Sequence, residues 1–211
     1  MENFSSPRTG CPNVRRVRWE RFFEDLQDQF DAEWESERTA LATEAERLRL
    51  SRVTLRDRLA ALAAAPGTSV SIEVGGETLT GTLSAVGHDW AALQHPSGGA
   101  AVVRLEAVLA VAGEQAVLAR SIRSSPGEAA SLTERMPLGY LLRDLVRRRA
   151  SMTVMLTDGT VLSGTADRAG ADHVDLALHE PGTARRAASV TGSRLVAFTA
   201  VRWLRWEPAG R

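Results

Sequence analysis

The sequence predicts an α+β protein in which an N-terminal helical region is followed by two small antiparallel β-barrels, each preceded by a helix. Three observations predict this class. Apolar residues recur at steps of three and four as far as residue 65, as they do on one face of a helix. In two later regions they alternate with polar residues, as in half-buried strands, and these two regions resemble each other. With 211 residues, 44% of them apolar, the chain is long enough for one large domain or two small ones.

The N-terminal region divides into an arm and a long helix. Residues 1–18 lack periodicity and contain two prolines and a glycine, which predicts a flexible arm. Residues 19–50 predict an amphipathic helix. This helix is acidic, because the chain carries ten acidic residues and two arginines between Glu20 and Glu46.

The apolar stripe of this helix is largely aromatic. We expect the helix to dock through the first six residues of the stripe: Trp19, Phe22, Phe23, Leu26, Phe30 and Trp34. A free helix would not leave so much aromatic surface in water, so this docking face should pack on a barrel of the same chain or of a twin subunit. A long two-stranded coiled coil is less favoured, because a strict heptad would place Glu33 and Glu37 at core positions.

The two predicted barrels, each with its leading helix, occupy residues 51–113 and 136–207. In the first, a Pro-Gly pair ends the helix. Apolar residues then follow a period of two, and a Gly-Gly pair predicts a tight hairpin turn between the first two strands. Residues 114–135 show weak periodicity and predict a linker between the barrels.

The two strand regions form an internal repeat with an offset of 83 residues. After one extra residue in the second hairpin, glycine, leucine and aspartate positions coincide: Gly76 and Gly159, Leu79 and Leu162, Gly81 and Gly164, Gly87 and Gly170, Asp89 and Asp172, Leu93 and Leu176. Further along, we expect three apolar residues to correspond as well: Val103 to Val190, Val108 to Leu195, and Val111 to Phe198. The repeat unit is one helix and about five short strands, and its glycines suit a small, strongly curved barrel.

The second copy carries a spaced set of apolar, aspartate and glycine residues: Val154, Leu156, Asp158, Gly159, Gly164 and Asp172, followed by Leu176. This pattern resembles the Sm-like small β-barrel of the Sm, LSm and Hfq proteins. The whole chain is similar to an uncharacterised actinobacterial family with a helical N-terminus and two such barrels. The resemblance implies two Sm-like barrels. The family's RNA sites use an asparagine and an Arg-Gly pair, which the corresponding loops of this chain lack, so RNA binding at that site is not expected.

No residue pattern predicts an enzyme. The chain has no glycine motif for a nucleotide, and its serines and histidines stand in no catalytic context. His173, Asp175 and His179 are spaced to share one face of a strand and could ligate a metal. A solvated outer face is the more common cause of such spacing. We therefore expect no catalytic residue, no metal and no cofactor.

Arginine supplies all 26 of the residues counted as basic. After residue 182, six arginines face one glutamate, and two of them alternate with tryptophans. Because arginine and aromatic rings both stack on bases, we expect a surface for nucleic acid or an acidic partner: Arg147, Arg148, Arg149, Arg185, Arg186, Arg194, Arg202, Arg205, Trp203 and Trp206. Two alternatives stay open. The three arginines that end the leading helix suit its dipole, and the tryptophans could belong to an edge strand with one indole in the core.

The predicted function is that of a non-enzymatic binding or scaffolding protein with a regulatory role. A barrel of about 60 residues buries too little surface to be comfortably stable alone, so the two copies should pack on one another or on the long helix. A protein partner or self-association is also expected. The alternative is an RNA- or DNA-binding regulator that uses the C-terminal arginines. The single cysteine, Cys11, permits no internal disulfide, and no apolar run can span a membrane, so we expect a cytoplasmic protein with no membrane partner.

Overall fold

The structure is a computed structural model. It describes residues 14–65, 67–95, 98–123, 132–183 and 185–206. The fold is α+β, with an N-terminal helix and an antiparallel sheet of ten strands. The chain forms two compact units, which meet in sequence between Arg52 and Val53. No helix among the described residues is long and apolar enough to cross a membrane.

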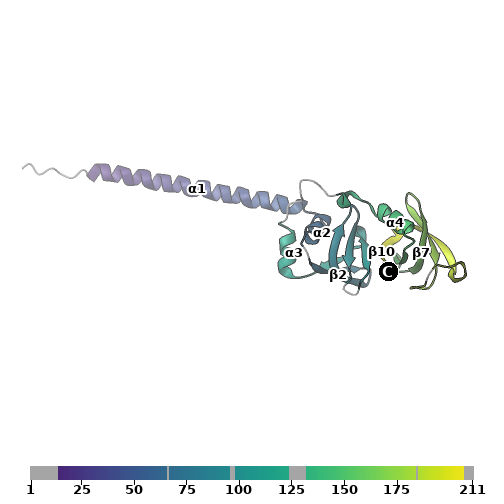
Figure 1. The fold of residues 1–211 in the computed structure, drawn as a ribbon. Coiled ribbons are helices and arrows are strands. Elements are labelled where there is room, and N and C mark those ends of the chain that lie inside the picture. The colour runs from purple at the N-terminus through teal and green to yellow at the C-terminus, as the bar shows by residue number, and fades with distance from the viewer. Residues whose placement is uncertain (1–13, 66, 96–97, 124–131, 184, 207–211) are drawn as a thin grey trace, which may run out of the picture. The chain divides into compact units, whose positions relative to one another are not determined.

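The described part of the first unit is helix α1 (Val14–Arg52; Figure 1). It covers the whole of the helix expected over residues 19–50. It also begins inside the segment expected to be an arm, because no proline or glycine follows Pro12 to stop a helix there. Residues 1–13 lie outside the described part of the chain. Near its C-terminal end, Arg49 pairs with Glu46 at 2.7 Å across one turn, which favours the helical conformation.

In the second unit, two helices and ten strands follow each other as two similar series along the chain. The first series has one helix and five strands: α2 (Leu55–Ala63), β1 (Ser69–Val74), β2 (Glu77–Val86), β3 (Trp90–Gln94), β4 (Ala100–Arg104) and β5 (Ala110–Ala112). The second series has the same composition: α4 (Leu138–Arg147), β6 (Ser151–Leu156), β7 (Val161–Ala169), β8 (His173–Leu178), β9 (Gly192–Ala197) and β10 (Val201–Trp206). We refer to residues 55–112 as the first repeat and to residues 138–206 as the second repeat.

The ten strands form one open sheet, in the order β5-β1-β2-β3-β4-β10-β6-β7-β8-β9. The expectation of two small Sm-like barrels is therefore not confirmed. The reason is that β4 pairs along its outer edge with β10, with Val103 opposite Trp203 and Ala100 opposite Trp206. If the two halves of the sheet were separate, β4 would be an exposed edge of one half and β10 an exposed edge of the other. Both halves nevertheless have the same internal strand order, and the long strands β2 and β7 have register irregularities at matching places.

The strand register corrects one part of the expected repeat. Val103 lies opposite Ala91, and Val196 lies opposite Val174, the counterpart of Ala91. Val103 therefore corresponds to Val196 and not to Val190. The same comparison matches two further pairs: Val102 with Leu195, and Val111 with Leu204. The offset rises from 83 to 93 because the chain from Ala177 to its partner Ser193, across β8 and β9, is ten residues longer than the chain from Gln94 to its partner Ala100, across β3 and β4.

Two buried clusters form the core, and each repeat contributes a tryptophan to the cluster of the other. Trp203, on β10, packs with the first repeat's cluster, which includes Ile72. Trp90, on β3, packs with the second repeat's cluster, which includes Val154. Strand β10 serves both clusters because successive side chains of a strand point to opposite faces, and Leu204 lies in the second cluster. The two repeats thus share their core across the β4–β10 pair.

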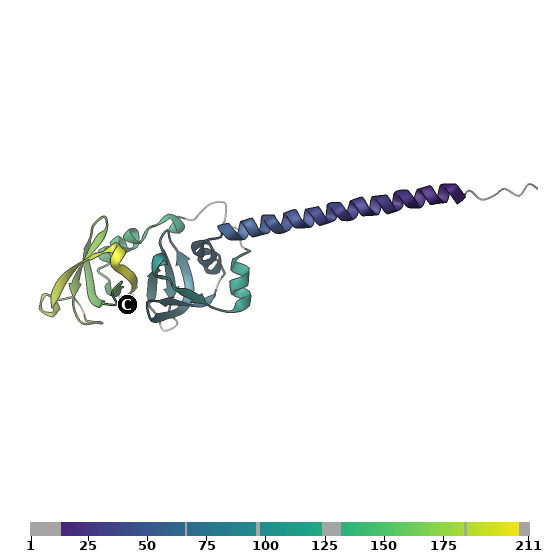
Figure 2. The ribbon, with the colours of Figure 1, turned by 180° about the vertical axis from the view of Figure 1, so that it is seen from behind.

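A helix that the sequence did not predict lies in the expected linker over residues 114–135. Helix α3 (Gln115–Ser121) lies beside α2 in both views (Figure 1 and Figure 2). Arg58 of α2 donates hydrogen bonds to the Leu118 carbonyl (2.8 Å) and to the Ser121 hydroxyl (3.1 Å). With only seven residues, α3 is too short to produce a clear period in the sequence.

Candidate functional site

The two ends of the sheet are open strands. β9 pairs only with β8, and β5 pairs only with β1, among the residues that the structure describes. Apolar side chains stand exposed at both ends: Leu195 on β9 and Leu109 beside β5 are each 71% exposed. An uncovered edge strand presents backbone donors and acceptors to any other chain that can pair with it.

These open edges repeat the two strands that join inside the molecule. By the register, β9 is the counterpart of β4, and β5 is the counterpart of β10. β4 and β10 pair with each other over four residues on each strand. The chain therefore contains one complete copy of this junction and the two separate halves of a second copy.

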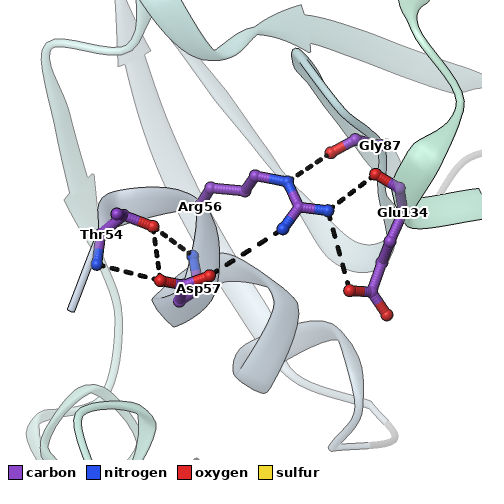
Figure 3. A network of polar contacts seen from close by, with 5 residues as sticks. All are labelled: Thr54, Arg56, Asp57, Gly87 and Glu134. Atoms are coloured by element: carbon purple, nitrogen blue, oxygen red, sulfur yellow. Dashed lines mark hydrogen bonds and ion pairs between the residues drawn. The ribbon is translucent and has the colours of Figure 1, made fainter. Parts of the chain in front are cut away.

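A network around Arg56 connects α2 to the segment that precedes α4 (Figure 3). The Arg56 guanidinium donates to the Gly87 carbonyl (3.0 Å) and to the Glu134 carbonyl (2.7 Å). On the same helix, Thr54 and Asp57 form a reciprocal capping box. The Arg56 side chain thus connects three segments of the second unit: helix α2, the β2–β3 turn and the segment before α4.

The β2–β3 turn is a second contact between the repeats. Trp90 donates from its ring nitrogen to the Met136 carbonyl (2.9 Å), and the Asp89 carboxylate accepts from the Leu138 backbone (2.8 Å). Arg104, only 7% exposed, lies 3.3 Å from the other Asp89 oxygen. In the second repeat the corresponding Asp172 is exposed and accepts from the His173 ring (2.9 Å), which lowers the pKa of the Asp172 carboxyl.

Several of the predicted nucleic-acid arginines have carboxylate partners. Arg147 and Arg148 both pair with Asp144. Arg185 pairs with Asp167 at 2.6 Å. The carboxylates of Asp144 and Asp167 therefore offset part of the positive charge that the sequence placed on this surface.

Arg202 lies between the hairpin turns of the two repeats. A Cβ atom at Gly75, in the β1–β2 turn, would overlap its guanidinium. In the β6–β7 turn, the backbone N–H and the hydroxyl of Thr160 donate to Asp158 and lower the pKa of that carboxyl, and the nearby Arg202 charge lowers it further. Arg202 therefore belongs to the junction between the repeats.

Besides the half-buried Arg202, four exposed arginines of the predicted surface have no ion pair among the described residues, and they come from four different parts of the second repeat: Arg149, Arg186, Arg194 and Arg205. Arg149 follows α4 with a positive φ of 51°. Arg194 lies on the open strand β9 and donates to the Ser193 carbonyl (3.2 Å). These side chains stay available for an anionic partner.

The two tryptophans of the predicted surface differ in exposure. Trp203 is 3% exposed, so its ring is not available to stack on a base. This agrees with the alternative that one of the two indoles lies in the core. The ring nitrogen of Trp203 has no hydrogen-bond partner among the described residues. Trp206 is half-buried at the end of β10.

The three residues weighed as metal ligands do not share one exposed face. His173 is half-buried, whereas His179 is 3% exposed and lies just beyond the end of β8 at Leu178. The His179 ring interacts with the Thr165 hydroxyl (2.9 Å) and the Glu180 carbonyl (3.0 Å). Within the described part of the chain, no three histidine, cysteine, aspartate or glutamate side chains gather as a metal site would need.

The predicted docking face of α1 is exposed where its side chains are described. Trp34 is 65% exposed, and Phe22, Phe23, Leu26 and Phe30 are also exposed. Trp19 lies in the part of α1 where only the backbone is described. Docking of this face on a barrel or a second subunit stays a prediction.

Comparison of the chain with protein-family models, curated proteins and solved structures finds no match.

Proposed function

We propose that this protein is a non-enzymatic scaffold, built on tandem Sm-like barrels and acting in the cytoplasm, that assembles with further copies of itself through its open sheet edges. The Sm-like part of this proposal is supported by the repeated unit of one helix and five strands, with an Asp-Gly hairpin in the second copy. The cytoplasmic part rests on the single cysteine, which permits no internal disulfide.

The observation that carries the proposal is the internal β4–β10 junction. Because the sequence repeats, each strand of this junction has a counterpart: β9 corresponds to β4, and β5 corresponds to β10. These two counterparts lie at opposite ends of the sheet. A contact between two different surfaces of identical subunits is heterologous, and it closes into a ring or continues as a filament. Strand β9 of one copy would then pair with β5 of the next.

The internal junction predicts the register of this contact. Val103 lies opposite Trp203, and Val102 lies opposite Leu204. Replacing each residue by its counterpart places Val196 opposite Ala110 and Leu195 opposite Val111. The exposed Leu195 side chain would be buried against Val111, which favours association through the hydrophobic effect.

The experiment is a disulfide trap in the Cys11→Ser background. Leu195→Cys combined with Val111→Cys should give intermolecular disulfides under mild oxidation, because residues directly opposite in an antiparallel pair have Cα atoms about 4.5–5.5 Å apart. The matched control combines Leu195→Cys with Ala110→Cys, which points to the other face and should be trapped less. Equal trapping of both combinations would contradict the register.

Light scattering on the full-length, cysteine-free chain provides a second measurement. The mass should exceed that of one chain at high concentration, and Leu195→Arg should return it to one chain. Leu132→Arg is the control, because Leu132 is 81% exposed and lies outside both edge strands. A mass of one chain at every concentration would overturn the proposal.

The second candidate is an RNA- or DNA-binding regulator. It is supported by the four exposed arginines without an ion pair among the described residues. If they bind phosphate, the affinity for a poly-uridine strand should fall with salt, with a log–log slope of about −0.7 for each phosphate contacted. Arg186→Gln with Arg194→Gln should reduce that slope. No binding at low salt would remove this candidate.

A further inference from the structure

A cavity of about 810 Å³ lies where the two repeats meet at the ends of their strands. Its lining includes Leu93 and Ala101 from the first repeat, and Met152, Thr153 and Arg205 from the second. The cavity exists because β4 and β10 pair, since Ala101 lies opposite Arg205 in that junction. Its volume is typical of sites that hold small organic molecules.

The electrostatic character of the cavity is positive. Arg205 lines it, and none of the described lining residues is an aspartate or a glutamate. No carboxylate among the described residues forms an ion pair with Arg205 elsewhere. An anion that enters would therefore find an arginine with its charge uncompensated.

The Arg205 side chain is exposed, and its guanidinium lies over the ring of Trp203. Its guanidinium carbon lies 4.6 Å from the centre of the Trp203 ring, and Trp203 is itself buried. Stacking uses the flat face of a guanidinium, whereas its N–H donors lie along the edge. The donors of Arg205 have no hydrogen-bond partner among the described residues, so they remain available to a carboxylate or phosphate.

The rest of the lining is suited to an apolar body with some polar groups. Leu93 and Met152 are buried side chains at the cavity wall, and Trp206 is half-buried there. The polar residues Thr80 and Thr153 also line it. Such a mixture of apolar surface and few polar groups is typical of ligand sites.

We propose that this inter-repeat cavity binds a small organic anion, with its carboxylate or phosphate on Arg205 and its apolar body against Leu93 and Ala101, which lie in the same cross-strand row as Arg205. The site is distinct from the open edges, because it is lined mainly by strands inside the sheet. Its occupation does not depend on self-association of the chain.

The experiment titrates the full-length protein, labelled with ¹⁵N, with phenyl phosphate and with phenylacetate. Saturable shifts should appear at Leu93, Ala101 and Thr153, which share the cross-strand row of Arg205. Inorganic phosphate alone should bind at least tenfold more weakly, because it lacks the apolar body, and benzyl alcohol should bind at least tenfold more weakly because it lacks the charge. The stronger of the two phenyl ligands identifies whether a phosphate or a carboxylate is preferred.

Two variants test the role of Arg205. Arg205→Gln should weaken the stronger phenyl ligand at least tenfold, while Arg194→Gln, an exposed arginine on β9, should leave its affinity unchanged. Arg205→Lys keeps the charge and should retain part of the affinity, which separates loss of binding from loss of folding. Absence of saturable shifts, shifts confined to other residues, or equal effects of the Arg205→Gln and Arg194→Gln variants would overturn the proposal.

Discussion

The carboxylate of Asp89 accepts a hydrogen bond from the backbone N–H of Leu138 at 2.8 Å, so a turn of the first repeat caps the leading helix of the second. Helix α4 begins after Pro137, which provides no side-chain cap of its own. Helix α2, in contrast, is capped within its own repeat by Thr54. The second repeat therefore takes one of its helix caps from the first.

Asp89→Ala should reduce the free energy of unfolding by about 1–3 kcal/mol, because it removes a helix cap and leaves the buried Arg104 without one carboxylate. Urea unfolding of the two proteins measures this difference. Asp172→Ala is the matched control: its side chain is 89% exposed and caps no helix among the described residues, so little change is expected. Equal effects of the two substitutions would contradict the proposed capping.

Gly164→Ala should destabilise the fold by about 1–3 kcal/mol through steric overlap. A Cβ at Gly164 would overlap the Ala177 carbonyl oxygen, and a Cβ at the matching Gly81 would lie 2.6 Å from the Gln94 carbonyl oxygen. Gly192→Ala is the control, since a Cβ there meets nothing within 4 Å. Thermal unfolding should separate these variants, and a melting temperature for Gly164→Ala as high as that of the control would refute the steric argument.

The pKa of Asp158 should lie below that of an ordinary aspartate, because Thr160 donates to the carboxylate from both its backbone and its hydroxyl. A carboxyl with a lowered folded-state pKa contributes stability above its unfolded-state pKa, and that contribution is lost as the pH falls through the folded-state value. Thr160→Ala should raise the Asp158 pKa part of the way, since only the hydroxyl is removed. An NMR titration of the carboxyl carbon measures both values, and an unchanged pKa in Thr160→Ala would argue against the hydroxyl contact.

Residues 53–211 should fold without residues 1–52, because they form a compact unit through their own contacts. Circular dichroism should show the loss of the α1 signal, and urea unfolding should show one cooperative transition for the remainder. The docking expected for the aromatic face of α1 predicts a lower unfolding midpoint for the truncated chain than for the full chain. An unchanged midpoint would contradict docking of α1 on the repeats, and the absence of a cooperative transition would contradict independent folding of residues 53–211.

The sequence by itself determined the local elements and their repetition. Apolar periodicity predicted the N-terminal helix and the helix-plus-five-strand unit, because the period of apolar residues reflects which face of an element is buried. Matching glycines at 81 and 164 indicated strong strand curvature, and the structure shows that a Cβ at either position would meet a carbonyl oxygen of the neighbouring strand. The short helix α3 escaped this method because seven residues contain too few turns to establish a period.

Only the tertiary structure decided how the repeats are joined and which residues meet there. Two equivalent halves have equivalent edges, and periodicity does not state which edge of one pairs with which edge of the other. The pairing of β4 with β10 opened the expected pair of barrels into one sheet, buried Trp203 in the first repeat's core and placed Arg205 at a cavity. The ten extra residues between paired positions of β8 and β9 also moved the counterpart of Val103 to Val196, because hydrogen-bonded register between strands sets that correspondence and sequence spacing alone does not.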